Sequence, residues 1–84
     1  MARYQILCWQ EIPSQIKAWD DFDEIRVELD SRFTTKIDEA AQSRGLTQAD
    51  HYLSQWKWSE EAEREGTPEQ VARALKQELE SKSG

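Results

Sequence analysis

Residues 4–19, which read YQILCWQEIPSQIKAW, contain the pattern that decides the fold. The segment Tyr4–Gln10 is short and rich in aliphatic and aromatic side chains, which predicts a strand. A loop signal with Pro13 inside it follows at Glu11–Ser14, and polar and apolar residues then alternate over Gln15–Trp19, which predicts a second strand. Because the two segments lie so close along the chain, we expect them to pair as a hairpin.

The segment after the hairpin predicts a helix. The acidic cluster Asp20–Glu24 ends the second strand, because Asp is depleted in strands and favoured in turns. Residues Glu24–Leu29 alternate with period two and suit either a third short strand or an extended lead into the helix. From Ser31 to Arg44 the apolar residues recur at helical spacing, and Gly45 supplies the left-handed residue that commonly stops a helix.

The second half of the chain predicts another strand and another helix. Residues Thr47–Asp50 suit one helical turn, and Tyr52–Trp58 then resumes period two with a strongly aromatic face. The acidic run over residues 60–65 reads as a solvated connection. Thr67–Gln70 has the residues of a capping box, which opens a helix running to about Ser81 and leaves a frayed tail at residues 82–84.

These elements predict one α+β domain spanning residues 1–84. The order is strand, strand, helix, strand, helix, without the strict alternation that a doubly wound parallel sheet requires. We therefore expect a small, mainly antiparallel sheet of three or four strands with two helices packed on one face.

Composition and charge exclude several classes of protein. The 84 residues include 17 acidic and 11 basic side chains, a net charge of −6, so binding to a nucleic-acid backbone is not expected. One cysteine makes no internal disulfide, and no stretch approaches the roughly 20 apolar residues that span a bilayer. We expect a cytoplasmic domain that binds neither nucleic acid nor membrane.

The residue types that most often carry chemistry are scarce. Cys8 and His51 are too few for a structural zinc site, which needs four such ligands. Cys8 suits a buried small hydrophobe; a thiol nucleophile would require His51 to lie beside it in the fold. The acidic runs lack the central Gly and the twelfth-position Glu of a calcium-binding loop. We therefore expect a non-enzymatic protein without a cofactor.

The aromatic residues are the informative feature. The chain has 4 Trp, and the first predicted strand carries apolar groups on both faces, although helices can cover only one face of the sheet. Part of this material belongs to the core of so small a domain. The remainder is expected to form an exposed interface for a protein partner or a second copy of the chain. The candidates are Trp9, Trp19, Tyr52, Trp56 and Trp58.

Two segments are more specific than the rest: the Trp-x₂-Ile-Pro-x-Gln hairpin at Trp9–Gln15 and the Tyr-Leu-x-Gln-Trp-x-Trp segment at Tyr52–Trp58. With them the chain resembles the small bacterial domain family labelled "virulence factor". The likeness covers nearly the whole chain, through Tyr4–Ala18, Arg32–Asp38, Arg44–Thr47, Tyr52–Trp58 and Glu63–Gly66. The chain departs from the family pattern at Cys8, where an aromatic is expected, and at Asp20–Glu24, where a more basic turn with Gly is expected.

The resemblance implies an accessory role and no reaction. Relatives stand alone or are joined to a scaffold-type domain linked with iron–sulfur assembly, and some accompany one-carbon and corrinoid methyl-transfer proteins. The leading hypothesis is an interaction domain that docks a partner or a second copy through an aromatic sheet face. The alternative is an accessory subunit in corrinoid methyl transfer or iron–sulfur assembly.

Overall fold

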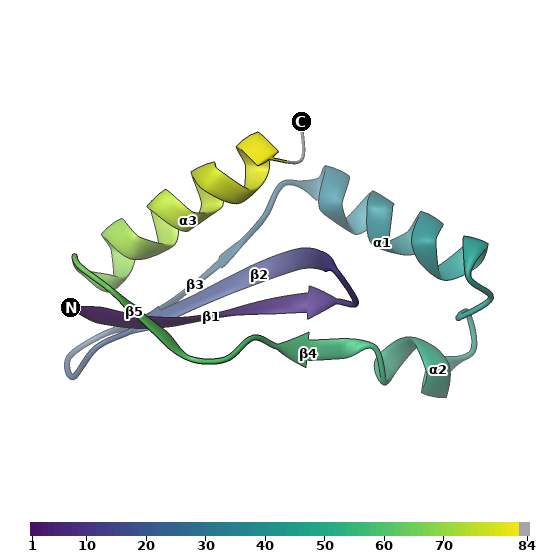
Figure 1. Cartoon of the computed structure of the whole chain (residues 1–84), viewed down its shortest axis with the longest axis horizontal. Helices are drawn as coiled ribbons and strands as arrows, with labels where there is room; N and C mark the ends of the chain where they lie inside the picture. The colour runs from purple at the N-terminus through teal and green to yellow at the C-terminus, as the bar shows by residue number, and fades with distance from the viewer. Residues whose placement is uncertain (83–84) are drawn as a thin grey trace.

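The computed structural model describes residues 1–82 and places five strands and three helices in them (Figure 1). In chain order they are β1 (Ala2–Trp9), β2 (Ile12–Trp19), β3 (Glu24–Glu28), α1 (Ser31–Ser43), α2 (Ala49–Leu53), β4 (Trp56–Trp58), β5 (Ala62–Arg64) and α3 (Pro68–Lys82). All strand pairs are antiparallel. The predicted α+β class and antiparallel sheet are confirmed.

Strand β1 lies in the middle of the sheet. The order is β3-β2-β1-β4, and β5 also pairs with β1. On one side β1 pairs with β2 from Arg3 to Trp9; on the other its end pairs with β4 and its start with β5. The two strands that follow α1 therefore return to the first strand of the chain.

The hairpin is tighter than the sequence predicts. Strand β2 already begins at Ile12, so Gln10 and Glu11 alone make the turn, with Gln10 in the left-handed region at φ 54°. The predicted loop Glu11–Ser14 is wrong, because Pro13 pairs with Cys8 within the ladder. The register shifts between Leu7 and Cys8, and a bulge is a position at which a strand tolerates proline.

Residues 24–29 and the first helix follow the prediction closely. Of the two structures that the sequence left open for residues 24–29, the strand is found, as β3. The Asp30 carboxylate then caps α1 by accepting from the Arg32 N–H at 3.0 Å. The helix ends before Gly45, whose φ of 68° is the left-handed conformation expected of it.

The segment between α1 and α3 differs most from the prediction. Tyr52 and Leu53 belong to the short helix α2, so the predicted strand Tyr52–Trp58 shrinks to β4. The Tyr52 N–H donates to the Gln48 carbonyl at 2.8 Å. The helical turn predicted at Thr47–Asp50 therefore continues to Leu53 as α2. The acidic run predicted as a solvated connection contains β5, because the start of β1 offers an edge that Ala62–Arg64 can pair with.

Helix α3 begins with the predicted capping box. The Thr67 hydroxyl accepts from the Gln70 N–H at 3.2 Å, and the Gln70 amide oxygen accepts from the Thr67 N–H at 3.1 Å. Lys82 is the last residue of the helix. Residues 83–84 of the predicted frayed tail lie outside the described residues.

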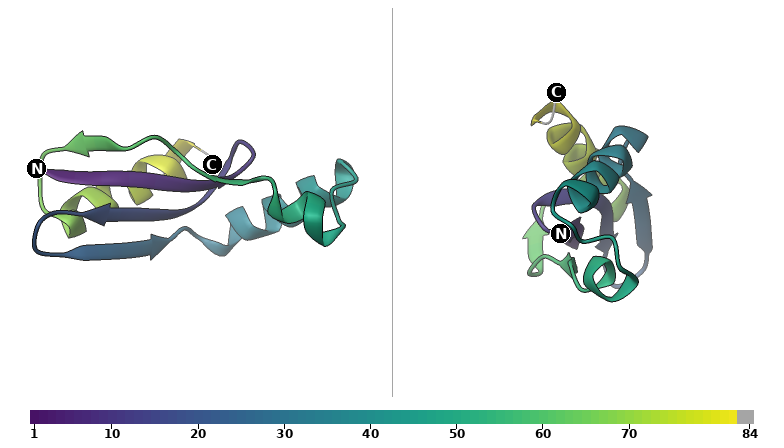
Figure 2. Two further views of the ribbon diagram at one scale, coloured as in Figure 1. Left: turned by 90° about the horizontal axis from the view of Figure 1, so that it is seen from below. Right: turned by 90° about the vertical axis from the view of Figure 1, so that its right-hand side faces the viewer.

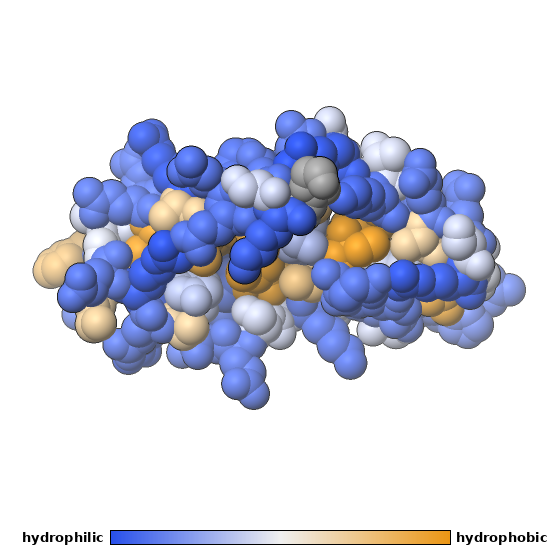
Figure 3. Space-filling model, turned by 45° about the horizontal axis from the view of Figure 1, so that its top comes forward, coloured by the Kyte–Doolittle hydropathy of each residue, from blue (hydrophilic) through white to orange (hydrophobic). Residues whose placement is uncertain are grey.

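Helix α3 covers one face of the sheet, whereas α1 and α2 extend beyond its end (Figures 1 and 2). The buried side chains form two clusters. The larger, under α3 and the start of α1, consists of Ala2, Ile16, Ala18, Leu29, Phe33, Val71, Ala72 and Leu75. The smaller, at the α1–α2 end, consists of Trp9, Ile37 and Ala41 with Ile12, Ala40, Leu46, Tyr52 and Trp56 packed on it. Seen from the helix side, the surface is mainly hydrophilic, with apolar atoms visible below the helices (Figure 3).

An ion pair connects the hairpin turn to the end of α1. The Arg44 guanidinium donates to both Glu11 oxygens, at 2.6 and 3.1 Å, and to the Gln10 side-chain oxygen. Because Arg44 stabilises the carboxylate, the pKa of Glu11 is lowered to about 2. This fork holds the start of β2 against the C-terminus of the helix.

We expect Glu11→Gln to destabilise the domain at neutral pH and to matter less in acid. A lowered pKa in the folded state contributes stability above the ordinary pKa, near pH 4.5, that is lost as the pH falls towards 2. The urea midpoints of the parent protein and the variant should therefore converge between pH 6 and pH 2.5. Glu61→Gln, at an exposed acid outside this ion pair, is the control. A difference that stays constant over this range would contradict the role given to Glu11.

Candidate functional site

The face of the sheet opposite α3 is the candidate site. In the view of Figure 2 that looks at this side, no described helix crosses the strands. Side chains alternate between the two sides along each strand, and residues directly opposite each other on neighbouring strands lie on the same side. Arg3, Gln5 and Leu7 of β1 and the residues paired with them therefore point to this side. This surface, the open face, comprises Arg3, Gln5, Leu7, Gln15, Lys17, Trp19, Glu24, Arg26, Glu28, Trp58 and Glu63.

Lys17 lies between two tryptophan rings near the middle of the open face. Its Nζ is 5.1 Å from the centroid of the Trp19 ring and 5.6 Å from that of Trp58. These are cation–π distances, worth about 0.5–1 kcal/mol each at exposed sites. The Lys17 side chain is 25% exposed and the Trp58 residue 39%, so a partner can reach both.

The open face carries charges of both signs. Arg3 and Lys17 come from the inner strands β1 and β2, and Lys17 lies directly opposite Arg26 on the edge strand β3. The acids Glu24, Glu28 and Glu63 come from β3 and β5. Arg3–Glu63 at 3.9 Å, Lys17–Glu24 at 4.0 Å and Arg26–Glu24 at 3.8 Å are long, exposed pairs. Such pairs contribute at most about 1 kcal/mol, so an incoming group can replace them at small cost. Although the chain is acidic, this face therefore presents as many basic as acidic side chains.

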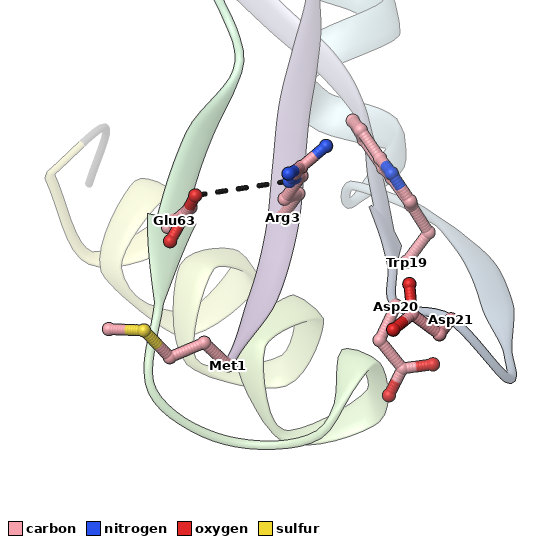
Figure 4. Close-up of a pocket in the computed structure, with 6 residues that line it drawn as sticks. All are labelled: Met1, Arg3, Trp19, Asp20, Asp21 and Glu63. Carbon is pink, nitrogen blue, oxygen red and sulfur yellow. Dashed lines mark ion pairs between the residues drawn. The ribbon is translucent and has the colours of Figure 1, made fainter.

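A hollow of about 240 Å³ lies at one end of the open face (Figure 4). Arg3 and Glu63 meet on one side of it and Trp19 stands on the other, with Asp20 and Asp21 at its end. The Asp20 carboxylate accepts the N–H groups of Asp23 and Phe22, each at 2.8 Å, and these bonds lower its pKa. Asp20 therefore holds the β2–β3 turn, and the indole and guanidinium remain for a ligand.

Three of the five predicted interface aromatics are not on the open face. Trp9 is completely buried, and its indole N–H donates to the Tyr52 carbonyl at 3.0 Å. The Tyr52 ring lies 5.8 Å from that of Trp9 and 6.2 Å from that of Trp56. Trp9 belongs to the same side of β1 as Leu7, but α1 and α2 enclose the end of that strand. Of the interface candidates, Trp9 belongs to the core, and Tyr52 and Trp56 pack with it.

Trp19 and Trp58 do share the open face, and they come from strands far apart in the chain. The sequence reasoning did not select Lys17, although it has the same parity as Trp19 in the predicted second strand. The spacing of two residues between Lys17 and Trp19 places both side chains on the same side of the strand, and this could have identified Lys17. The placement of Trp58 beside Lys17 depends on the pairing of Leu7 with Trp58, which no local pattern contains.

The other candidates for chemistry do not assemble into a site. Cys8 is partly buried, and burial raises the pKa of its thiol, which opposes the thiolate that a nucleophile requires. His51 is exposed on α2. Within residues 1–82, no three side chains of the His, Cys, Asp and Glu types are grouped to hold a metal ion. Nor does any helix in this range have the length and apolar character that crossing a bilayer requires.

Because Trp9 is buried and Trp58 exposed, replacing each by alanine should reduce the free energy of unfolding by different amounts. Trp9→Ala removes a fully buried ring and should destabilise the domain by about 3–5 kcal/mol. Trp58→Ala removes an exposed ring and should cost less than about 1 kcal/mol. Urea denaturation followed by far-ultraviolet circular dichroism measures both. Equal losses of stability would contradict the assignment of Trp58 to an exposed face.

Comparison with known proteins places the chain in one family. The family model described as "Virulence factor" matches residues 7–83. Neither the curated proteins nor the solved structures contain a match to this chain.

Proposed function

The chain belongs to the virulence factor family, and from this premise we propose that it is a non-enzymatic protein-interaction domain that docks a partner protein through its open face. The observation that carries the proposal is the Lys17 ammonium flanked by Trp19 and Trp58 on the side of the sheet that α3 leaves uncovered. Trp58 is exposed and Trp19 half-buried, and Trp is enriched among the residues that contribute most to binding.

The chemistry of the open face favours a partner with an acidic side chain between apolar ones. An incoming carboxylate can bind Lys17 and Arg26, whose own pairs with Glu24 are long and exposed. Apolar groups on either side of that carboxylate would pack on the rings of Trp19 and Trp58. The domain's charge of −6 lies elsewhere on its surface, so this face is where an acidic partner meets the least repulsion.

A second copy of the chain fits this face less well. In a two-fold interface the same patch meets itself, so Lys17 and Arg26 of one copy would approach those of the other. Two chains of charge −6 also repel each other as they approach. A partner from corrinoid methyl transfer or iron–sulfur assembly, as the resemblance implies, would satisfy the proposal, because it concerns the surface and not the pathway.

The experiment begins with a photo-crosslinking residue placed at Gln15, on the open face, and in a parallel sample at Gln77, exposed on α3. The proposal expects one cellular protein to be crosslinked reproducibly from Gln15, and expects that protein to be absent from the crosslinks of Gln77. That protein is then purified, and its affinity for variants of the domain is measured by calorimetry. Crosslinks to a second copy of the domain from Gln15 would favour a homodimer and contradict the choice of partner.

We expect Lys17→Glu and Trp58→Ala each to weaken binding of that partner by more than about tenfold. Lys17→Met should weaken binding less than Lys17→Glu, because it keeps the aliphatic stem and adds no repulsion. Leu53→Ala and Phe22→Ala are matched controls, since both residues are exposed apolar side chains outside the open face, and binding should be unchanged. Equal losses for the controls, or unchanged binding by Trp58→Ala, would overturn the proposal.

A further inference from the structure

Strand β3 forms an open edge of the sheet. It is the outermost strand beside β2, and in Figure 2 no described segment lies beyond it. The opposite edge is divided between two strands of three residues, β4 and β5, which lie along different parts of β1. Short strands protect an edge from pairing, whereas β3 offers five consecutive residues.

The direction of the free hydrogen-bonding groups follows from the ladder between β2 and β3. The Leu29 N–H donates to the Ser14 carbonyl and the Asp20 N–H to the Asp23 carbonyl, both at 2.9 Å. Hydrogen-bonded and non-hydrogen-bonded pairs alternate between these two ends. Ile25 therefore faces β2 with its backbone groups.

By the same alternation, the N–H and C=O groups of Glu24, Arg26 and Glu28 point away from the sheet. Near the end of the strand, the Lys76 ammonium donates to the Glu28 carbonyl at 3.4 Å and covers that position. The backbone groups of Glu24 and Arg26 pair with no segment of residues 1–82. The first half of β3 is thus ready to accept another strand.

A groove runs beside this half of the strand. It has a volume of about 430 Å³ and lies between the start of β3 and the start of α3. Ile25 and Pro68 supply its apolar surface, and Asp23, Glu24 and Glu69 are its acidic residues. Its chemistry suits a side chain with a long aliphatic stem and a positive end, which is that of lysine or arginine.

We propose that the edge of β3 accepts an extended, basic peptide segment of a partner protein, which adds a strand to the sheet. Backbone bonds to Glu24 and Arg26 supply the pairing, and alternate side chains of the peptide enter the groove towards Asp23 and Glu69. The net charge of −6 attracts such a segment and speeds its association. This site shares Glu24 and Arg26 with the open face, but it uses their outward backbone groups and not their side chains, so the two proposals are tested separately.

A second copy of the chain is a poorer occupant of this edge. Antiparallel pairing of β3 with itself about Arg26 places Arg26 opposite Arg26 and Glu24 opposite Glu28. Like charges directly opposite each other destabilise a strand pair. The acids of the groove, moreover, would meet a second chain of charge −6.

The probe for this proposal is the peptide acetyl-Thr-Lys-Thr-Lys-Thr-Lys-amide. If it pairs with Arg26, its threonines lie on the side of the open face and make the backbone bonds, and its lysines lie on the side of the groove. N-methylation of the threonines should therefore abolish binding. The same change at the lysines should leave binding within about twofold, since those N–H groups point away from the sheet. The two methylated peptides have equal charge, which controls for non-specific attraction.

Variants of β3 provide the matching test on the protein. Arg26→Pro removes the outward N–H at an edge position where proline is compatible with a strand, whereas Arg26→Thr removes the same side chain and keeps the N–H. We expect peptide binding, followed by ¹⁵N–¹H NMR, to be lost in the first variant and kept in the second. Glu69→Lys, which leaves the strand intact, should weaken binding by more than about tenfold.

Hydrogen exchange at the Arg26 amide gives a direct readout, and the peptide should slow it by more than about tenfold. Equal binding of the two methylated peptides would overturn the proposal. So would chemical-shift changes confined to Lys17 and Trp58 on the open face. An Arg26 amide already protected without peptide, in a protein that sediments as a dimer, would show that a second copy occupies the edge.

Discussion

The backbone of β1 is hydrogen-bonded on both of its sides, and every other part of the domain takes its place from that arrangement. On one side it pairs with β2, its neighbour in sequence; on the other it pairs with β4 and β5, which follow α1 and α2. The pairing of Ala2 with Arg64 brings the chain to the point where α3 begins. Only from there can α3 lie across the sheet and bury Val71, Ala72 and Leu75.

Two small cores then replace one large one. The domain is long and thin, 41 by 27 by 15 Å, so no single cluster reaches from one end to the other. The α3 cluster stabilises the strands, and the Trp9 cluster stabilises the end where α1 and α2 meet β1. Ile12 packs against both, and the ion pair of Arg44 with Glu11 joins the same region from outside. The hairpin turn is therefore the junction between the two halves.

One side of the sheet is uncovered because only α3 lies across the strands, on the other side, whereas α1 and α2 extend beyond the end of the sheet. Its polar side chains make that side compatible with water, and Lys17 lies over the faces of two rings that would otherwise be more exposed. The same charged residues that face the solvent from β3 alternate with Ile25 and Val27, which pack inward. The open face and the β3 edge thus arise from the same two-layer construction, although they offer a ligand different chemistry.

The local elements were predictable wherever a few neighbouring residues decide the conformation. The capping box at Thr67, the left-handed Gly45 and the alternation of Gln15 to Trp19 each depend on bonds or sterics within a single turn or strand. The strand β5 and the continuation of the predicted turn through Tyr52 as α2 were not predictable in this way, because Ala62–Arg64 and Tyr52 acquire their partners from β1. The sequence by itself determined that the strands carry large apolar side chains, including tryptophans, on both faces of a sheet of which helices can cover only one. Tertiary structure alone decided that Trp9 is buried and Trp58 exposed, because burial depends on which distant segment encloses a residue, and parity along one strand does not contain that information.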